Sequence, residues 1–174
     1  MSRRSKIEFI ITGAFIAAAY AGLTYLSNIF QLAYGPIQLR ISEILTVLPV
    51  FTPAAIPGLT LGCFIANIGS FNAADMLFGT AATLAAAILT YYLRGIKTKG
   101  IPVLSLLPPV IVNAVVIGFE IALFFLPEGY SFWGFIISGF QVGIGQFIVC
   151  FIFGIPFYLV VKKYRIFERK YIKR

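Results

Sequence analysis

Long apolar runs, separated by short clusters of basic residues, constrain this chain more than any other feature. The clearest runs cover about residues 7–27, 75–93, 103–126 and 132–161. A helix of about 20 apolar residues spans the roughly 30 Å hydrocarbon core of a bilayer. Because 60% of the residues are hydrophobic and only 11% are charged, a soluble fold of this size could not bury the apolar surface. The pattern predicts an all-α membrane bundle that forms one domain over residues 1–174.

The stretch from residue 43 to residue 70 is also apolar, but it carries Pro49, Pro53 and Pro57. A proline inside a helix removes a backbone hydrogen bond and collides with the preceding turn. One straight helix is therefore disfavoured, and we expect two short helices over about residues 43–55 and 57–70. Together with the four longer runs, they give six transmembrane helices.

The basic residues support six crossings rather than five. Lys and Arg concentrate on the cytoplasmic side of membrane proteins. With six crossings, every basic residue except Arg40 lies on one side: those before residue 7, those at residues 94–99 and those after residue 161. With five crossings, the second and third groups would move to the opposite side from the first. We therefore predict that both termini are cytoplasmic.

Polar residues in the outer half of this bundle indicate a ligand pocket. A carboxylate at membrane depth costs several kcal/mol unless it is paired or hydrated. Glu120 gives the strongest signal, because its run is otherwise apolar apart from Asn113, which lies seven residues earlier on the same helix face. A hydrogen bond between helices would also explain such a pair. We favour a ligand contact.

Glu43 opens the second expected helix, close to Arg40, which is the one basic residue predicted outside. Two explanations of Glu43 fit equally well: it caps the helix, as Ser42 also could, or it belongs to the site. For Asp75, at the start of the fourth helix, we prefer capping. The other candidates near the same outer face are Gln38, Asn67, Gln141 and Trp133. Anchoring at the membrane interface accounts for Trp133 at least as well as ligand stacking does.

The first helix carries small residues at every fourth position: Ala14, Ala18 and Gly22. This spacing lets another helix approach closely. Packing within the bundle is one explanation, and docking of a partner protein is the other.

The sequence lacks the residues that several classes of protein require for their function. The chain has no histidine and no GxxxxGK[ST] motif, and Cys63 and Cys150 form no CxxC pair. A zinc site, a P-loop ATPase site and a hydrolytic catalytic pair are therefore not expected. The net charge of +8 sits at the ends of apolar runs, which disfavours nucleic acid as a partner. The sequence predicts a protein that is not an enzyme and that holds no metal or cofactor.

Three segments resemble the QueT family: IQLRISEILTVLP over residues 37–49, FTPAAIPG over residues 51–58 and LPPVIVN over residues 107–113. The likeness extends from the first helix to the sixth. The resemblance implies an S component of an energy-coupling factor transporter in a bacterial plasma membrane. Such a subunit captures a queuosine precursor outside, docks on a transmembrane scaffold subunit and depends on two ABC ATPase subunits. The absent ATPase motif agrees with that division of labour.

The ligand implied by this resemblance, queuine or preQ1, carries a 7-deazaguanine ring. Its N1–H and exocyclic amine are adjacent donors that one carboxylate can accept together. Asn113 could serve the ring carbonyl, and a cationic aminomethyl group would need a second carboxylate. Glu43 and Glu120 supply two acids, and the sequence does not assign the two ends of the ligand between them. The alternatives are an S component for another heterocyclic vitamin, a stand-alone carrier, a membrane enzyme and a purely structural membrane protein.

Overall fold

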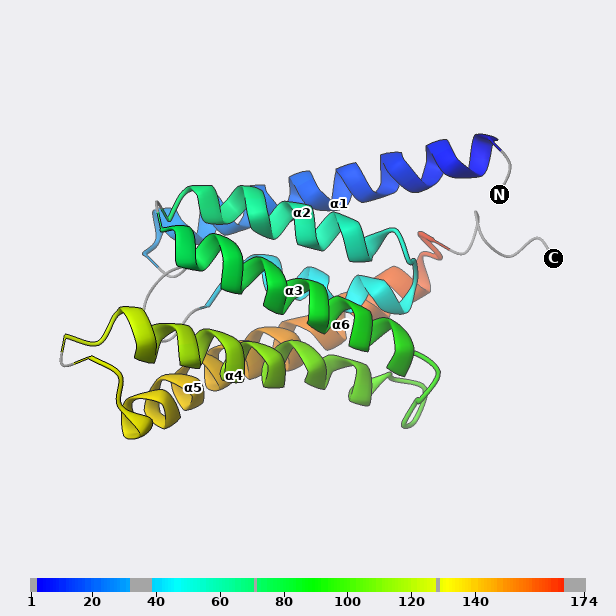
Figure 1. Cartoon of the computed structure of the whole chain (residues 1–174). Helices are drawn as coiled ribbons and strands as arrows, with labels where there is room; N and C mark the ends of the chain where they lie inside the picture. Colours follow the sequence, from blue (N-terminus) through cyan, green and yellow to red (C-terminus); the bar gives the residue numbers. More distant parts are fainter. Residues whose placement is uncertain (1–2, 32–38, 71, 128, 168–174) are drawn as a thin grey trace.

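The computed structural model describes residues 3–31, 39–70, 72–127 and 129–167, and every regular element in these residues is a helix (Figure 1). The predicted all-α bundle is therefore confirmed. The elements are α1 (Arg3–Ile29), η1 (Ile41–Val50), α2 (Ala55–Ile68), α3 (Ala73–Leu93), η2 (Val103–Leu106), α4 (Leu107–Phe124), α5 (Phe132–Phe147), η3 (Ile148–Phe153) and α6 (Gly154–Lys163).

Four helical stretches are long and apolar enough to cross a membrane by length and composition: Arg3–Ile29, Ala73–Leu93, Val103–Phe124 and Phe132–Lys163. The two shorter apolar helices, η1 and α2, complete the bundle. Much of the outer surface is apolar, with large exposed side chains such as Phe15, Leu77 and Phe140. The molecule is accordingly a multi-pass membrane protein.

The proline-rich stretch forms two short helices, as its prolines indicate. The break lies between Val50 and Ala55, slightly earlier than expected, because Pro57 falls in the first turn of α2. A proline is tolerated there, since the first N–H groups of a helix have no intrahelical partner. The 10 residues of η1 form a 3₁₀ helix, which rises about 2 Å per residue and so extends about 20 Å.

Two glycines of α2 bring its backbone against α1. A Cβ atom added at Gly58 would lie 2.7 Å from the carbonyl oxygen of Gly13, and one added at Gly62 would lie 2.7 Å from that of Ala17. The contact positions rise together along both helices, so α1 and α2 run in the same direction. The chain has therefore returned along η1 between them (Figure 1), which supports two crossings in the proline-rich stretch.

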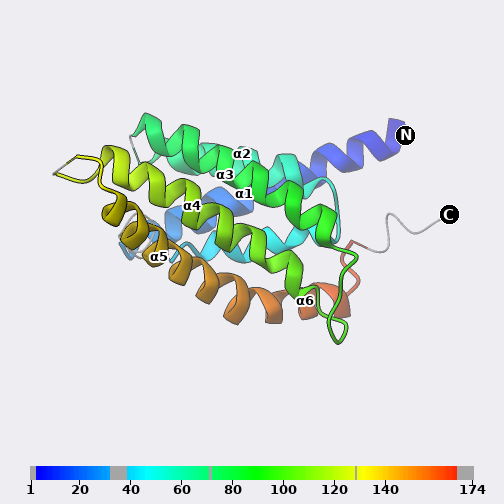
Figure 2. The ribbon, with the colours of Figure 1, turned by 60° about the horizontal axis from the view of Figure 1, so that its bottom comes forward.

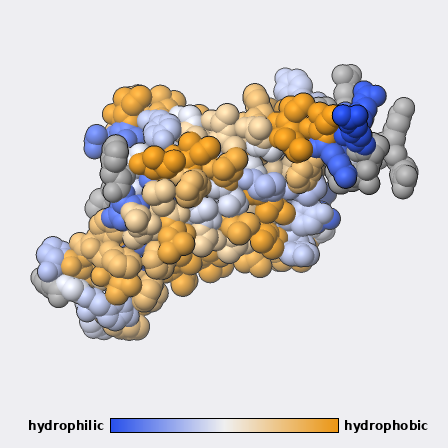
Figure 3. All heavy atoms as spheres, turned by 45° about the horizontal axis from the view of Figure 1, so that its top comes forward, coloured by the Kyte–Doolittle hydropathy of each residue, from blue (hydrophilic) through white to orange (hydrophobic). Residues whose placement is uncertain are grey.

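Apart from Arg40, the basic residues that the structure describes gather at one end of the bundle (Figure 1). The start of α1 and the end of α6 lie at this end in both ribbon views (Figures 1 and 2). The loop after α3 joins them, because Lys162 Nζ and the Tyr158 hydroxyl donate to the Gly100 carbonyl oxygen at 3.2 and 3.4 Å. Figure 3 shows a hydrophilic cluster where α1 begins and apolar residues over much of the same face. This arrangement is typical of a membrane protein with one cationic side.

The last predicted helix, residues 132–161, is one continuous helical stretch that changes type in its middle. It is α-helical in α5, a π-helix in η3 and α-helical again in α6. Pro156 lies just after the π-helical turn and cannot donate a backbone hydrogen bond. The wider turn accommodates this missing bond and brings η3 against η1.

Candidate ligand-binding site

Polar side chains from four elements meet toward the end opposite the basic one. Arg40 precedes η1, Asn67 lies near the end of α2, Asp75 lies in the first turn of α3 and Glu120 lies in the last turns of α4. The elements η1, α2, α3 and α4 alternate in direction, so these positions come to the same end (Figure 1). Arg40, Asn67 and Glu120 are buried, and Asp75 is half-buried.

Asn67 joins three of these elements through its side-chain amide. Its Oδ1 accepts from Arg40 Nη1 at 3.3 Å, and its Nδ2 donates to the Asp75 carbonyl oxygen at 2.8 Å. Nδ2 also lies 3.5 Å from Cys63 Sγ. Gly79 of α3 makes room for this amide, because a Cβ atom there would lie 2.5 Å from Nδ2. Any larger residue at position 79 would displace the amide and loosen the cluster.

Glu43 is buried and held by partners from other elements. The Tyr20 hydroxyl of α1 donates a hydrogen bond to Glu43 Oε1. Arg40 interacts with the Glu43 carboxylate electrostatically, and the Gln146 side chain of α5 lies beside it. A ring of polar groups thus surrounds one carboxylate whose charge is compensated by a guanidinium.

Neither Ser42 nor Glu43 caps η1. The residue at the cap position is Arg40, and within the described residues it makes no capping hydrogen bond through its side chain. Ser42 Oγ instead accepts from the Thr24 hydroxyl at 2.7 Å. The capping explanation for Glu43 is therefore wrong, since both side chains are turned toward α1 rather than toward the free N–H groups of their own helix.

Glu120 differs from Glu43 because few hydrogen-bond donors surround its carboxylate. It is only 1% exposed, yet neither of its oxygens has a hydrogen-bond partner among the described residues. Asp75 and Arg40 are near enough to interact with it electrostatically. Asn113, also buried, precedes it on the same face of α4. A buried polar group without a partner destabilises a fold by about 1–3 kcal/mol or more, which indicates a functional reason for Glu120.

Asp75 does not cap α3, contrary to expectation. The cap is Asn72, whose Oδ1 accepts from the Ala74 backbone N–H at 2.8 Å. Asp75 follows in the first turn of the helix. Because a nearby amide already satisfies the helix end, the Asp75 carboxylate is left to interact with Glu120.

The remaining predicted residues lie elsewhere. Trp133 is 71% exposed at the start of α5, outside the buried cluster, where anchoring at the membrane interface suits it. Gln141 is half-buried in α5, and Gln38 lies outside the described residues.

Sequence reasoning missed two residues of the cluster, Tyr20 and Gly79. For Tyr20 there was a signal: it lies three and seven residues after Ala17 and Gly13, on the face of α1 that packs against α2.

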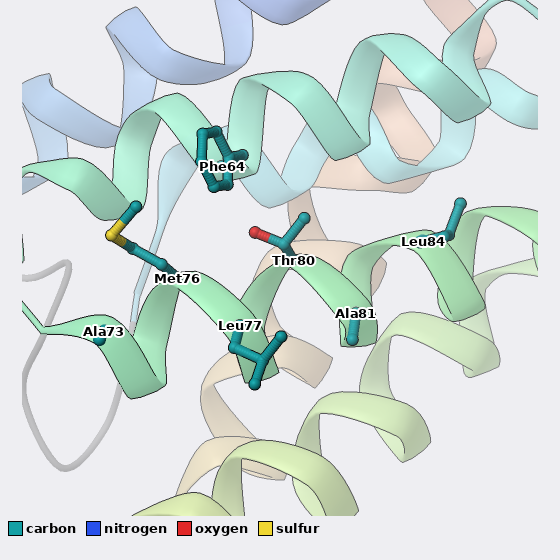
Figure 4. A pocket seen from close by; sticks show the side chains of 7 residues that line it. All are labelled: Phe64, Ala73, Met76, Leu77, Thr80, Ala81 and Leu84. Atoms are coloured by element: carbon teal, nitrogen blue, oxygen red, sulfur yellow. The ribbon is translucent and has the colours of Figure 1, made fainter.

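An apolar hollow of ≈ 440 Å³ also lies between α2 and α3 (Figure 4). Its lining residues are Phe64, Ala73, Met76, Leu77, Thr80, Ala81 and Leu84. Thr80 projects between the two helices in this view (Figure 4), and it supplies the only side-chain oxygen of the lining. A surface without charged groups cannot orient a polar heterocycle by ionic hydrogen bonds. The buried acid cluster is therefore the better candidate site.

A comparison with known families decides the class of this protein. The profile of the QueT transporter family matches residues 10–163, a range that contains every residue of the buried cluster. The chain belongs to the QueT transporter family. The family resemblance carried by the arginine- and proline-containing segments is thereby confirmed.

One curated relative of this QueT family member is the queuosine precursor transporter QueT of Lactococcus lactis subsp. cremoris, strain MG1363. The two chains are 39% identical over 82 residues, which make up 47% of this chain and 48% of the relative. The matched part thus spans about half the length of that relative. No solved structure matches the chain.

Proposed function

We propose that this QueT family member is the substrate-binding S component of an energy-coupling factor importer and captures a queuosine precursor from outside the cell. The buried cluster of two acids, one guanidinium and three amides carries the proposal. The name of the Lactococcus relative supports the choice of ligand class. The chain itself acts in binding and transport rather than catalysis, and separate subunits hydrolyse ATP.

The hydrogen-bonding groups of the cluster complement a 7-deazaguanine. The free lone pairs of Glu43 can accept from the ring N1–H and the exocyclic amine. Asn67, Asn113 and Arg40 are buried with it and provide donors for the ring carbonyl and acceptors for its N–H groups. Because buried polar groups left unpaired are costly, such a site would reject ligands that lack these donors.

Equilibrium binding to the purified protein tests the ligand class. We expect queuine or 7-aminomethyl-7-deazaguanine (preQ1) to bind with micromolar or better affinity, and adenine, a purine with a different donor and acceptor pattern, to bind at least about 100-fold more weakly. Failure of every 7-deazaguanine to bind would reject the assignment. A different vitamin recovered with the protein from its host would point to another S component.

We propose that the basic end of the bundle faces the cytoplasm, with both termini inside, and that the acid cluster faces outward in a bacterial plasma membrane. The gathering of basic residues at one end supports this orientation. Cysteine introduced in place of Lys97, in the loop tied to α6, should react with a membrane-impermeant maleimide only after the cells are opened. Reaction in intact cells would reverse the orientation.

The exposed stripe of small residues on α1 supports docking on a transmembrane scaffold subunit. Ala14, Ala18 and Gly22 are all exposed, whereas Ala17 and Ala21 are buried against the bundle. A Cβ atom added at Gly22 would meet no other atom within 4 Å. The bundle therefore uses the neighbouring stripe for its own packing and leaves this one available for a partner helix.

A further inference from the structure

Glu43 and Glu120 are both buried acids near Arg40, but their surroundings differ. Glu43 receives a hydrogen bond from Tyr20 and has Arg40 as its counter-charge. Neither oxygen of Glu120 has a hydrogen-bond partner of good geometry among the described residues; its strongest interaction with a charged group is with Asp75, another acid, and a weaker one is with Arg40. One guanidinium therefore serves both buried acids, and Asp75 adds a third carboxyl group beside Glu120.

This imbalance has a chemical consequence. Two carboxyl groups in a buried place repel each other unless a proton or a cation lies between them. Asp75 is fixed nearby, because its carbonyl oxygen accepts from Asn67 and its helix is capped by Asn72. The pair formed by Glu120 and Asp75, called the acid pair below, thus has no positive neighbour of its own among the described residues, because Arg40 is shared with Glu43.

We infer that the acid pair binds the protonated amine of the ligand, while Glu43 binds the purine-like ring edge. This inference rests on the proposed function and deepens it by assigning the two ends of the ligand. Because Arg40 already compensates the negative charge of Glu43, the carboxylate of Glu43 suits neutral N–H donors. The acid pair needs a full positive charge, and an alkylammonium offers one charge and up to three donors.

The shape of the ligand class agrees with this assignment. In a 7-aminomethyl-7-deazaguanine the amine is attached to the five-membered ring, and the N1–H and exocyclic amine lie at the far edge of the six-membered ring. The two ends therefore need acids from different elements. Glu43 on η1 and the acid pair on α3 and α4 meet that need, and contacts of Arg40 with Glu43 and of Asn67 with Arg40 and Asp75 link them.

Two ligands that differ only in the substituent at position 7, one cationic and one neutral, test the assignment. The full-length protein is titrated with cationic 7-aminomethyl-7-deazaguanine and with the neutral nitrile 7-cyano-7-deazaguanine. We expect the wild-type protein to bind the cation about 10- to 100-fold more tightly, as one ionic hydrogen-bonded contact allows. Glu120→Gln should lower affinity for the cation by about tenfold or more and leave affinity for the nitrile within about twofold.

Gln has the shape of a protonated Glu, so Glu120→Gln also separates the inference from its main rival. If Glu120 is only a neutral acid that packs helices together, neither affinity changes and the inference is overturned. Asp75→Asn, at a half-buried position, should also lower affinity for the cation but not for the nitrile, by a smaller factor. This variant tests the inference if Glu120→Gln fails to fold. Glu8→Gln, which alters an acid paired with Arg4 outside the site, is the matched control and should change neither affinity.

The failures of the two proposals are distinguishable. If the wild-type protein binds neither compound, the proposed function fails and the inference fails with it. If the protein binds both compounds equally, or if Glu120→Gln and Asp75→Asn weaken both equally, the proposed function stands and the acid pair is not an amine site.

Discussion

Replacing Ala18 with tryptophan is expected to reduce uptake of the ligand by at least about tenfold in cells that contain the full transporter. Ala18 is exposed in the middle of the small-residue stripe on α1. Two helices approach closely only where their facing residues are small, so an indole ring at this position would hold a scaffold helix away. Ligand binding to the purified variant should be unchanged, because the stripe lies on the face of α1 opposite Tyr20.

The control for this variant is Ala85→Trp, which places the same bulk at an exposed alanine in the membrane-spanning part of α3. It should leave both uptake and binding intact. Normal uptake by both Ala18→Trp and Ala14→Trp would remove the stripe from the docking surface. Loss of binding together with uptake would instead show that the substitution disturbs the bundle.

Replacing Glu43 with glutamine is expected to weaken binding of both 7-deazaguanines by about 100-fold or more, and by the same factor for each. The carboxylate is proposed to accept two ring donors at once, and an amide has only one acceptor atom to offer. The NH₂ group of the new glutamine would also face a donor of the ligand. Equilibrium titration of the purified variant with each compound measures the effect.

The fold of this variant should survive, because the glutamine carbonyl can still accept from the Tyr20 hydroxyl that now bonds Glu43. The melting temperature of the ligand-free variant separates an effect on binding from an effect on folding. The control is again Glu8→Gln, which lies outside the cluster. Unchanged affinity for both compounds would show that Glu43 has only a structural role at the centre of the bundle.

The acids of the candidate site could be predicted from the sequence more readily than the residues that contact them. Glu120 and Asn113 could be predicted as a pair because each interrupts an apolar run, and an interruption is visible without a structure. Tyr20 and Gly79 could not be predicted with the same ease, because tyrosine and glycine are ordinary residues in membrane helices. Their roles arise from contacts with Glu43 and Asn67, residues that are distant in sequence.

The sequence by itself determined that this chain lies in a membrane, that its proline-rich stretch breaks into two helices and that its basic residues, Arg40 excepted, gather on one side. These properties follow from hydropathy, proline geometry and charge, which act locally or along the whole chain. Only the tertiary structure decided that Asp75 lies near Glu120 rather than caps α3, and that Glu43 accepts a hydrogen bond from Tyr20 while Glu120 has another acid beside it. The packing of α1, α2, α3 and α4 decides which polar groups meet, because the partner of a buried charge depends on distances in space and not on spacing in sequence.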